Sequence, residues 1–135
     1  MMRVLLPAGW PRPRGYANGV VARGHLVFVA GMVGWNPDGT FPSDTLVGQA
    51  RLALQNVVAV LAEAGAKPEH IVRMTWYVLD KQAYLAAGAE LGAVFREVIG
   101  SYNLAMSAVQ VCALMEDRAL VEIEVTAVIP DHVVP

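Results

Sequence analysis

An alternation of apolar and polar residues in the C-terminal stretch 120–129 constrains the fold more than any other feature of the sequence. Side chains point to opposite faces of a β-strand in turn, so such a run has one apolar face and one polar face. The apolar face consists of Val121, Ile123, Val125, Ala127 and Ile129. The other face carries Glu122, Glu124 and Thr126, and its two carboxylates are roughly 6–7 Å apart along the strand. We expect a half-buried strand whose glutamates take part in any chemistry of the protein.

Other β-rich runs occur in pairs along the sequence. Residues 103–111 precede the alternating run, and the polar residues 115–119 lie between the two. Residues 19–22 and 26–30 are separated by the turn signal Arg23-Gly24. Runs of this kind joined by turn residues are typical of β-hairpins, so we expect one hairpin near each end of the chain.

The middle of the sequence changes to a helical period. Apolar residues recur at helical spacing over 45–64 and again over 81–99, and Ser43 or Asp44 is placed to cap the first helix. Between them, residues 71–79 are apolar on both faces, which indicates a strand buried on both sides. The order β-β-α-β-α-β-β predicts an α+β fold, a mixed sheet with both helices packed on one face.

The composition indicates what surrounds this fold. The chain has 135 residues, so we expect a single domain covering 1–135. Charged residues make up only 16% of it, whereas about 25% is usual for a soluble protein. The sheet face away from the helices would also carry apolar residues, so we expect copies of the same chain to cover it in a homo-oligomer. No apolar run reaches the roughly 18 residues of a membrane-spanning helix, so no membrane partner is expected.

Charge, cysteine and histidine exclude several further classes of partner. The formal net charge is −2 and no cluster of Lys and Arg occurs, so we expect no nucleic-acid partner. The single cysteine, Cys112, falls in a predicted strand and is expected to be a small buried hydrophobe. A chain with one cysteine and no secretory signal favours a cytoplasmic location. His25, His70 and His132 are scattered, so we expect neither a metal site nor a cofactor.

Short segments spread over most of the chain carry a further signal. They are Gly15-Tyr16, Val27–Met32, Gln49, Leu54–Val57, Ala64–Ala66, Ile71–Arg73, Tyr77–Asp80, Val94-Phe95, the set Ala105, Ser107 and Val109, and Val121–Glu124. No single segment is specific. Their order and spacing together resemble the family of reactive-intermediate deaminases (RidA/YjgF) over roughly residues 15–129.

The resemblance implies a fold and an activity. The family's fold is similar to that of chorismate mutase, and it forms homotrimers with ligand clefts between the subunits. Its best-studied branch hydrolyses 2-imino or enamine acids to 2-keto acids and ammonia. There, an arginine of a Pro-Ala-Arg motif holds the substrate carboxylate through a bidentate pair. A glutamate that matches Glu122 positions water against the imine carbon, so the resemblance implies a catalytic role for Glu122.

This sequence departs from the family pattern at three contact positions. Met106 stands in the place of the motif's arginine, Ala30 replaces a serine, and Gly88 replaces an asparagine. Tyr16 and Glu122 are retained. The changes predict a larger and more apolar cleft, in which the flexible thioether of Met106 suits an aromatic or acyl ligand. The residues expected to bind this small molecule are Tyr16, Ala30, Gly31, Gly88, Met106 and Ser107.

Three functions remain open at this point. The first is hydrolysis of a bulkier, less acidic imine or enamine, with Glu122 as general base and Tyr16 as a hydrogen-bond donor at the rim. The structural alternative for Glu122 is that it pairs with an arginine, such as Arg14 or Arg73, and only holds the interface. The second function is a non-catalytic, small-molecule-binding homotrimer, because loss of the motif's arginine with the fold retained is what a repurposed cleft would show. An endoribonuclease is less favoured, because the chain lacks a basic patch. The sequence leaves open whether Arg12, Arg14 or Arg73 provides a new anchor for an anion.

Overall fold

The computed structural model describes residues 2–133, which form six strands and three α-helices. The strands are β1 (Met2–Leu5), β2 (Gly19–Ala22), β3 (His25–Val33), β4 (Ile71–Val78), β5 (Ala105–Gln110) and β6 (Val121–Ile129). The helices are α1 (Leu46–Glu63), α2 (Lys81–Ala86) and α3 (Gly88–Val98), with a short 3₁₀ turn at Pro68–His70 before β4.

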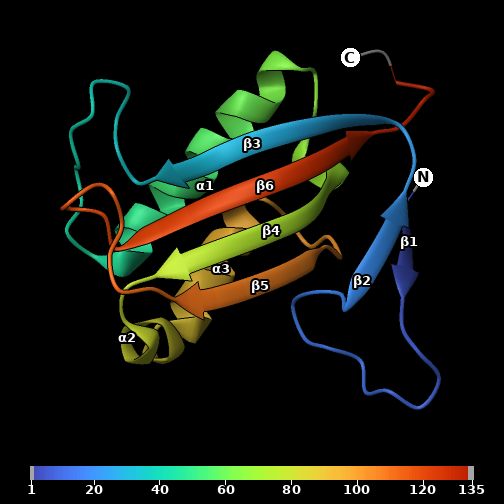
Figure 1. The fold of residues 1–135 in the computed structure, drawn as a ribbon, viewed down its shortest axis with the longest axis horizontal. Helices are drawn as coiled ribbons and strands as arrows, with labels where there is room; N and C mark the ends of the chain where they lie inside the picture. Colours follow the sequence, from blue (N-terminus) through green and yellow to red (C-terminus); the bar gives the residue numbers. More distant parts are fainter. Residues whose placement is uncertain (1, 134–135) are drawn as a thin grey trace.

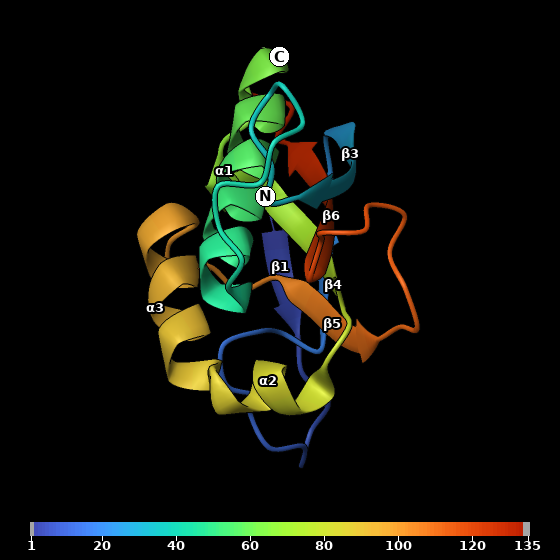
Figure 2. The same ribbon diagram turned by 90° about the vertical axis from the view of Figure 1, so that its left-hand side faces the viewer.

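A four-stranded mixed sheet forms the centre of the fold (Figure 1). Its strand order is β3-β6-β4-β5, in which β6 pairs antiparallel with β3 and β4, and β4 pairs parallel with β5. β1 and β2 form a separate antiparallel ribbon beside one end of the sheet. α1 and α3 lie on one face of the sheet, and the other face is uncovered in the single chain (Figure 2). The predicted α+β fold with its helices on one face is therefore confirmed.

The connections between strands explain why the helices share a face. β3 and β4 both run antiparallel to β6, so they are parallel to each other, and α1 connects them. α2 and α3 connect the parallel strands β4 and β5, continuing in the same direction across the sheet. Such crossovers are nearly always right-handed, so both connections place their helices on the same side.

The predicted C-terminal hairpin is wrong, because β4 lies between β5 and β6. In β6, every second side chain from Val121 to Ile129 is buried, as the alternation predicted, whereas most of β5 is exposed. The more fully buried strand takes the central position and β5 takes the edge. Residues 111–120 carry the chain past the end of β4. Cys112 lies in this segment and is exposed, so its prediction as a buried strand residue is also wrong.

The predicted N-terminal hairpin is wrong as well. β2 pairs with β1, whereas β3 pairs with β6 from His25↔Ile129 onward. Gly24, between β2 and β3, has a φ of 149°, and a Cβ on it would lie 1.9 Å from the carbonyl oxygen of Ile129. Only glycine combines this backbone conformation with such a close approach. The Arg23-Gly24 signal therefore marks a crossing from one sheet to the other rather than a hairpin turn.

The helices pack onto the sheet through the predicted faces. The fully buried apolar residues of α1 are Ala50, Ala53, Leu54, Val57 and Leu61. Thr45, rather than Ser43 or Asp44, caps this helix, because its hydroxyl accepts a 3.1 Å hydrogen bond from the Gly48 amide. The second predicted helix is divided at Ala87 into α2 and α3. Within residues 2–133, no helix is long and apolar enough to cross a membrane.

Candidate functional site

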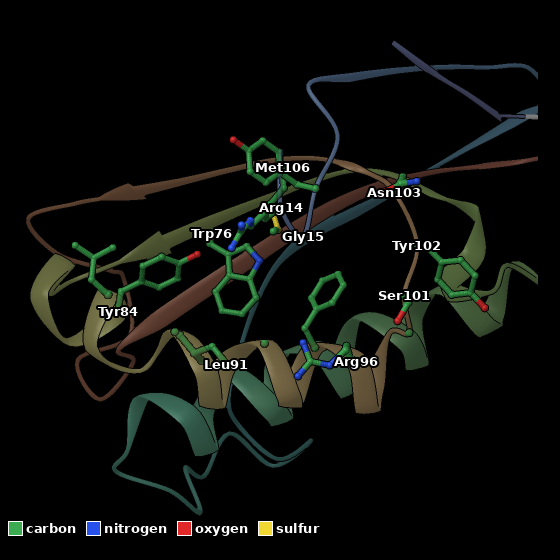
Figure 3. A pocket seen from close by; sticks show the side chains of 16 residues that line it. Arg14, Gly15, Trp76, Tyr84, Leu91, Arg96, Ser101, Tyr102, Asn103 and Met106 are labelled. Carbon is green, nitrogen blue, oxygen red and sulfur yellow. The ribbon is translucent and has the colours of Figure 1, made fainter. Parts of the chain in front are cut away.

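A cavity of about 500 Å³ lies between the β5 side of the sheet and α3 (Figure 3). Trp76 of β4 and Met106 of β5 form its sheet wall, and α2 and α3 form its helical wall. Residues 14–16 of the loop between β1 and β2, together with residues 100–103 before β5, line its remaining sides. The cavity therefore brings together segments that lie far apart in the sequence, from Arg14 to Met106.

Aromatic side chains form a large part of this lining. They are Tyr16, Trp76, Tyr84, Phe95 and Tyr102. Trp76 is only 3% exposed, and its ring meets that of Tyr84 edge-on with 6.0 Å between the centroids. Burial raises the pKa of the Tyr84 hydroxyl, which therefore remains neutral at physiological pH. Walls of this kind suit a planar apolar group, because rings pack against rings through large, rigid faces.

Three of the binding residues predicted from the sequence lie together in this cavity: Tyr16, Gly88 and Met106. Gly88 leaves open space, because outside its chain neighbours and the adjoining backbone of α3 no heavy atom lies within 4 Å of the position that a Cβ would take there. Of the three candidate anion anchors, only Arg14 lines the cavity. Arg73 instead lines a smaller hollow of about 200 Å³ on the uncovered sheet face.

Arg96 of α3 also lines the cavity, and sequence reasoning missed it. A signal was present, since Arg96 follows Gly88 and Gly92 at intervals of four residues. Residues four apart lie on one side of a helix, so the two glycines and Arg96 lie on the same side of α3. The glycines leave this side without side chains up to the guanidinium group of Arg96. A Cβ on Gly92 would lie 3.3 Å from an Nη atom of Arg96, which places that side chain over this side of α3.

The other four predicted site residues lie outside this cavity. Ala30 and Gly31 occupy a bulge in β3, the edge strand opposite β5. Glu122 on β6 is in register with Val33 of β3 and with Tyr77 of β4. Ser107 follows Met106 on β5, so its side chain points to the uncovered face of the sheet. One chain therefore holds the predicted site in two separate parts.

The carboxylate of Glu122 lies directly against Gly31. A Cβ on Gly31 would lie 2.2 Å from Oε2 of Glu122 and 2.6 Å from its carboxyl carbon. Bulges often redirect side chains at functional positions, and this one brings a residue without a side chain to face the glutamate. The three salt bridges found within residues 2–133 include neither Glu122 nor Arg14 nor Arg73. Within one chain, Glu122 is therefore not held in an ion pair with either arginine.

Glu124, the second carboxylate of the strand, has a different environment. The hydroxyl of Tyr77 donates a hydrogen bond to its Oε1. This hydrogen bond is the main cause of the raised pKa of Tyr77, so the tyrosine stays protonated and remains a donor at neutral pH. Among residues 2–133, the carboxylate of Glu124 accepts a side-chain hydrogen bond, whereas no hydrogen bond to the carboxylate of Glu122 is found. In the described part of the chain, no group of three or more His, Cys, Asp or Glu side chains is placed to hold a metal ion.

Comparison with known proteins identifies the family. The sequence profile of the family described as endoribonuclease L-PSP matches residues 11–129. The chain belongs to this family, the RidA/YjgF family. A RutC family protein of Synechocystis is 33% identical over 96% of this chain and 98% of its own length. The 2-iminobutanoate/2-iminopropanoate deaminase of Escherichia coli is 35% identical over 84% of this chain and 86% of its own length.

Solved structures of the RidA/YjgF family share the fold. A protein of the conserved Rid family from Yersinia pestis, itself of unknown function, superposes with a TM-score of 0.83 at 31% identity. That alignment covers 95% of this chain and 98% of the other. The predicted chorismate-mutase-like α+β fold is thus confirmed.

Proposed function

We propose that this RidA/YjgF protein is an imine or enamine deaminase, which hydrolyses a reactive imine to a carbonyl compound and ammonia. The C=N bond is replaced by C=O, the oxygen comes from water, and the nitrogen leaves as NH₃. The family membership and the similarity to the deaminase of E. coli support this class of reaction. The division of the predicted site between the β3 side and the β5 edge of the sheet supports a site built from two subunits.

That division is the observation on which the proposal depends most. Tyr16, Gly88 and Met106 line a cavity at the β5 edge, whereas Gly31 and Glu122 lie at the β3 side. These two sides of one sheet cannot meet within a chain. They meet when the β3 side of one copy packs beside the β5 edge of the next, and head-to-tail contacts of this kind form a ring when the rotation between copies closes. A homotrimer with a cleft between neighbouring subunits is the assembly we propose.

The uncovered sheet face supports such an assembly. Leu26 and Phe28 of β3 are 61% and 72% exposed in the single chain, and Val109 of β5 is 44% exposed. Large apolar side chains grouped on an open face of a sheet are usual at subunit interfaces. Both edge strands therefore present apolar surface that a neighbouring copy would cover.

In this cleft, Glu122 acts as the general base. Its carboxylate takes a proton from water as the water oxygen attacks the imine carbon, and a carbinolamine forms. That proton passes to the nitrogen, which completes the neutral carbinolamine. The carboxylate then takes the proton of the new hydroxyl group and passes it to the amine, so the C=O bond forms as the C–N bond breaks and NH₃ leaves. Glu122 makes no ion pair within residues 2–133 and lies against a glycine, so its carboxylate is available to accept a proton from water.

A non-catalytic, small-molecule-binding homotrimer is the second candidate function. The presence of Met106 in the cavity favours it, because a thioether cannot hold a carboxylate as the family's arginine does. The ribonuclease named in the family description is not proposed, since among the described residues no histidine lines the cavity for acid–base cleavage of RNA.

The deaminase proposal is tested by generating imines with an amino-acid oxidase and trapping them with semicarbazide. We expect the purified protein to lower the trapped fraction of the imine derived from phenylalanine, because hydrolysis competes with trapping. If a protein of confirmed trimeric size does not raise the hydrolysis rate of small or aromatic imines above the spontaneous rate, the deaminase proposal is contradicted. The small-molecule-binding homotrimer would then be the remaining candidate function.

Gly31→Ala is expected to slow this hydrolysis by roughly 10²-fold, because the new methyl group displaces the Glu122 carboxylate. A displacement of about 1 Å of a catalytic group is enough to lower the rate by this factor. The effect on thermal stability should be a few degrees at most, since the clash falls on the end of a flexible side chain. Gly19→Ala in β2 is the matched control, because its Cβ meets only the side chain of Leu5, at 3.3 Å. Equal rates for the two variants would show that Gly31 does not position the base.

A further inference from the structure

We propose that Arg14 and Arg96 together form a new anion anchor, and that the cavity binds an aromatic carboxylate. The inference rests on the proposed function in one respect, namely that the bound anion is the substrate or product of the imine hydrolysis. The site residues themselves are argued from the cavity of a single chain. They take over the role that Met106 cannot perform.

The charge of the cavity is the first argument. Both arginines line it, and among the residues that the structure describes no aspartate or glutamate does so (Figure 3). The three salt bridges within residues 2–133 use other arginines, in the pairs Arg23–Asp131, Arg51–Glu97 and Arg118–Asp44. Arg14 and Arg96 therefore bring two positive charges to one cavity without a carboxylate to balance them. An anionic ligand supplies that balance.

The chemistry of the guanidinium group specifies the anion further. Its planar fork donates two parallel hydrogen bonds to a carboxylate, and it also stacks on aromatic faces. Arg14 comes from the loop between β1 and β2, and Arg96 comes from the last turn of α3. Because they come from separate elements, two arginines can contact one carboxylate from different directions. Ser101 and Asn103 of the loop before β5 add polar groups to the same lining.

The size and apolar lining of the cavity indicate the rest of the ligand. A volume of about 500 Å³ falls within the range of roughly 300–1,000 Å³ that holds drug-sized molecules, and is far more than a three-carbon acid fills. Trp76, Tyr84 and Phe95 present aromatic surface, and Met106 adds a flexible thioether. The open space over Gly88 admits a ring where a larger residue would block it. The ligand class is therefore an aromatic 2-imino acid and the 2-keto acid that forms from it.

Isothermal titration calorimetry with three compounds separates the contributions of ring and charge. The first compound is phenylpyruvate, which has both groups. The second is phenylacetone, which has the ring and the ketone but no carboxylate, and the third is pyruvate, which has no ring. We expect phenylpyruvate to bind most tightly, by roughly tenfold or more over each of the others, because only it uses both parts of the cavity.

Arg14→Gln and Arg96→Gln test the anchor directly. Each is expected to weaken phenylpyruvate binding by roughly ten- to hundredfold and to leave phenylacetone binding within about threefold of the wild type. Arg12→Gln is the matched control, because Arg12 lies in the same loop as Arg14, is exposed and does not line the cavity. The control removes the same charge and should change neither affinity.

Several results would overturn the anchor. They are an absence of phenylpyruvate binding, equal binding of phenylpyruvate and phenylacetone by the wild type, unchanged binding in either cavity variant, and an equal loss in the Arg12 control. Failure of the proposed function gives a different pattern. If phenylpyruvate binding depends on both arginines while no imine is hydrolysed, the anchor stands and the protein is a binding protein.

Discussion

Replacing Glu122 by glutamine is expected to lower the rate of imine hydrolysis by roughly 10²- to 10⁴-fold, the usual contribution of a positioned general base. The amide has nearly the same shape as the carboxylate but cannot accept the proton from water. The side chain faces a glycine and forms no salt bridge within residues 2–133, so the change leaves no ion-pair partner there without its counter-charge. The measurement is the semicarbazide competition assay with the phenylalanine-derived imine.

Glu124→Gln is the matched control for this variant. It lies two residues along the same face of β6 and removes the same charge, but its carboxylate already accepts the hydrogen bond from Tyr77. We expect Glu124→Gln to keep activity within about threefold of the wild type and Glu122→Gln to keep its affinity for phenylpyruvate. Both variants must elute at the size of the wild-type assembly. Hydrolysis by Glu122→Gln at the wild-type rate would exclude Glu122 as the base.

The elements of this fold follow from local patterns, but the pairing of the strands does not. The alternation in β6 correctly predicts which side chains are buried, because successive side chains of a strand point to opposite faces of the sheet and only one face packs against the helices. Strands that follow one another in the sequence were predicted to pair as hairpins, yet β6 lies between β3 and β4. The choice of partner depends on which strand buries the most surface in the complete sheet. That property belongs to the whole chain and cannot be seen in any one turn.

The candidate site was predictable to a similar degree. Tyr16, Gly88 and Met106 are far apart in the sequence, and only the family resemblance brought them together before the cavity did. Arg96 could be found from the sequence only by extending the helical spacing of Gly88 and Gly92 by one more step. Its role in the site depends on which residues lie opposite α3, and the helical spacing does not show these. The distance between Glu122 and the cavity also depends on the strand order, which places Gly31 and Met106 at opposite edges. Residue types could be predicted, whereas their division between two sides of the sheet could not.

Gln49 connects α1 to the strand that carries Glu122. Its side chain is buried, with 1% of its surface exposed. The amide nitrogen donates to the carbonyl oxygens of Ser43 at 3.1 Å and Arg118 at 2.9 Å, and Oε1 accepts from the Leu120 amide at 2.7 Å. Two turns further along the helix, Asn56 donates to the carbonyl oxygens of Val33 and Trp35 at the end of β3. The two amides thus fix the start of β6 and the end of β3, which flank Glu122 and Gly31.

Gln49→Leu is expected to lower the free energy of unfolding by roughly 3–5 kcal/mol, because it leaves the partner groups of Gln49 buried or half-buried without a hydrogen bond, at about 1–3 kcal/mol each. Leucine fills a similar volume, so lost polar contacts rather than a cavity would account for the change. Urea denaturation followed by circular dichroism measures it. Gln55→Leu on the exposed side of α1 is the control and should stay within about 0.5 kcal/mol of the wild type. Equal stability of the two variants would mean that the hydrogen bonds of Gln49 to Ser43, Arg118 and Leu120 do not stabilise the fold. The pairing of β6 with β3 and β4 would then be the only interaction that fixes the position of Glu122.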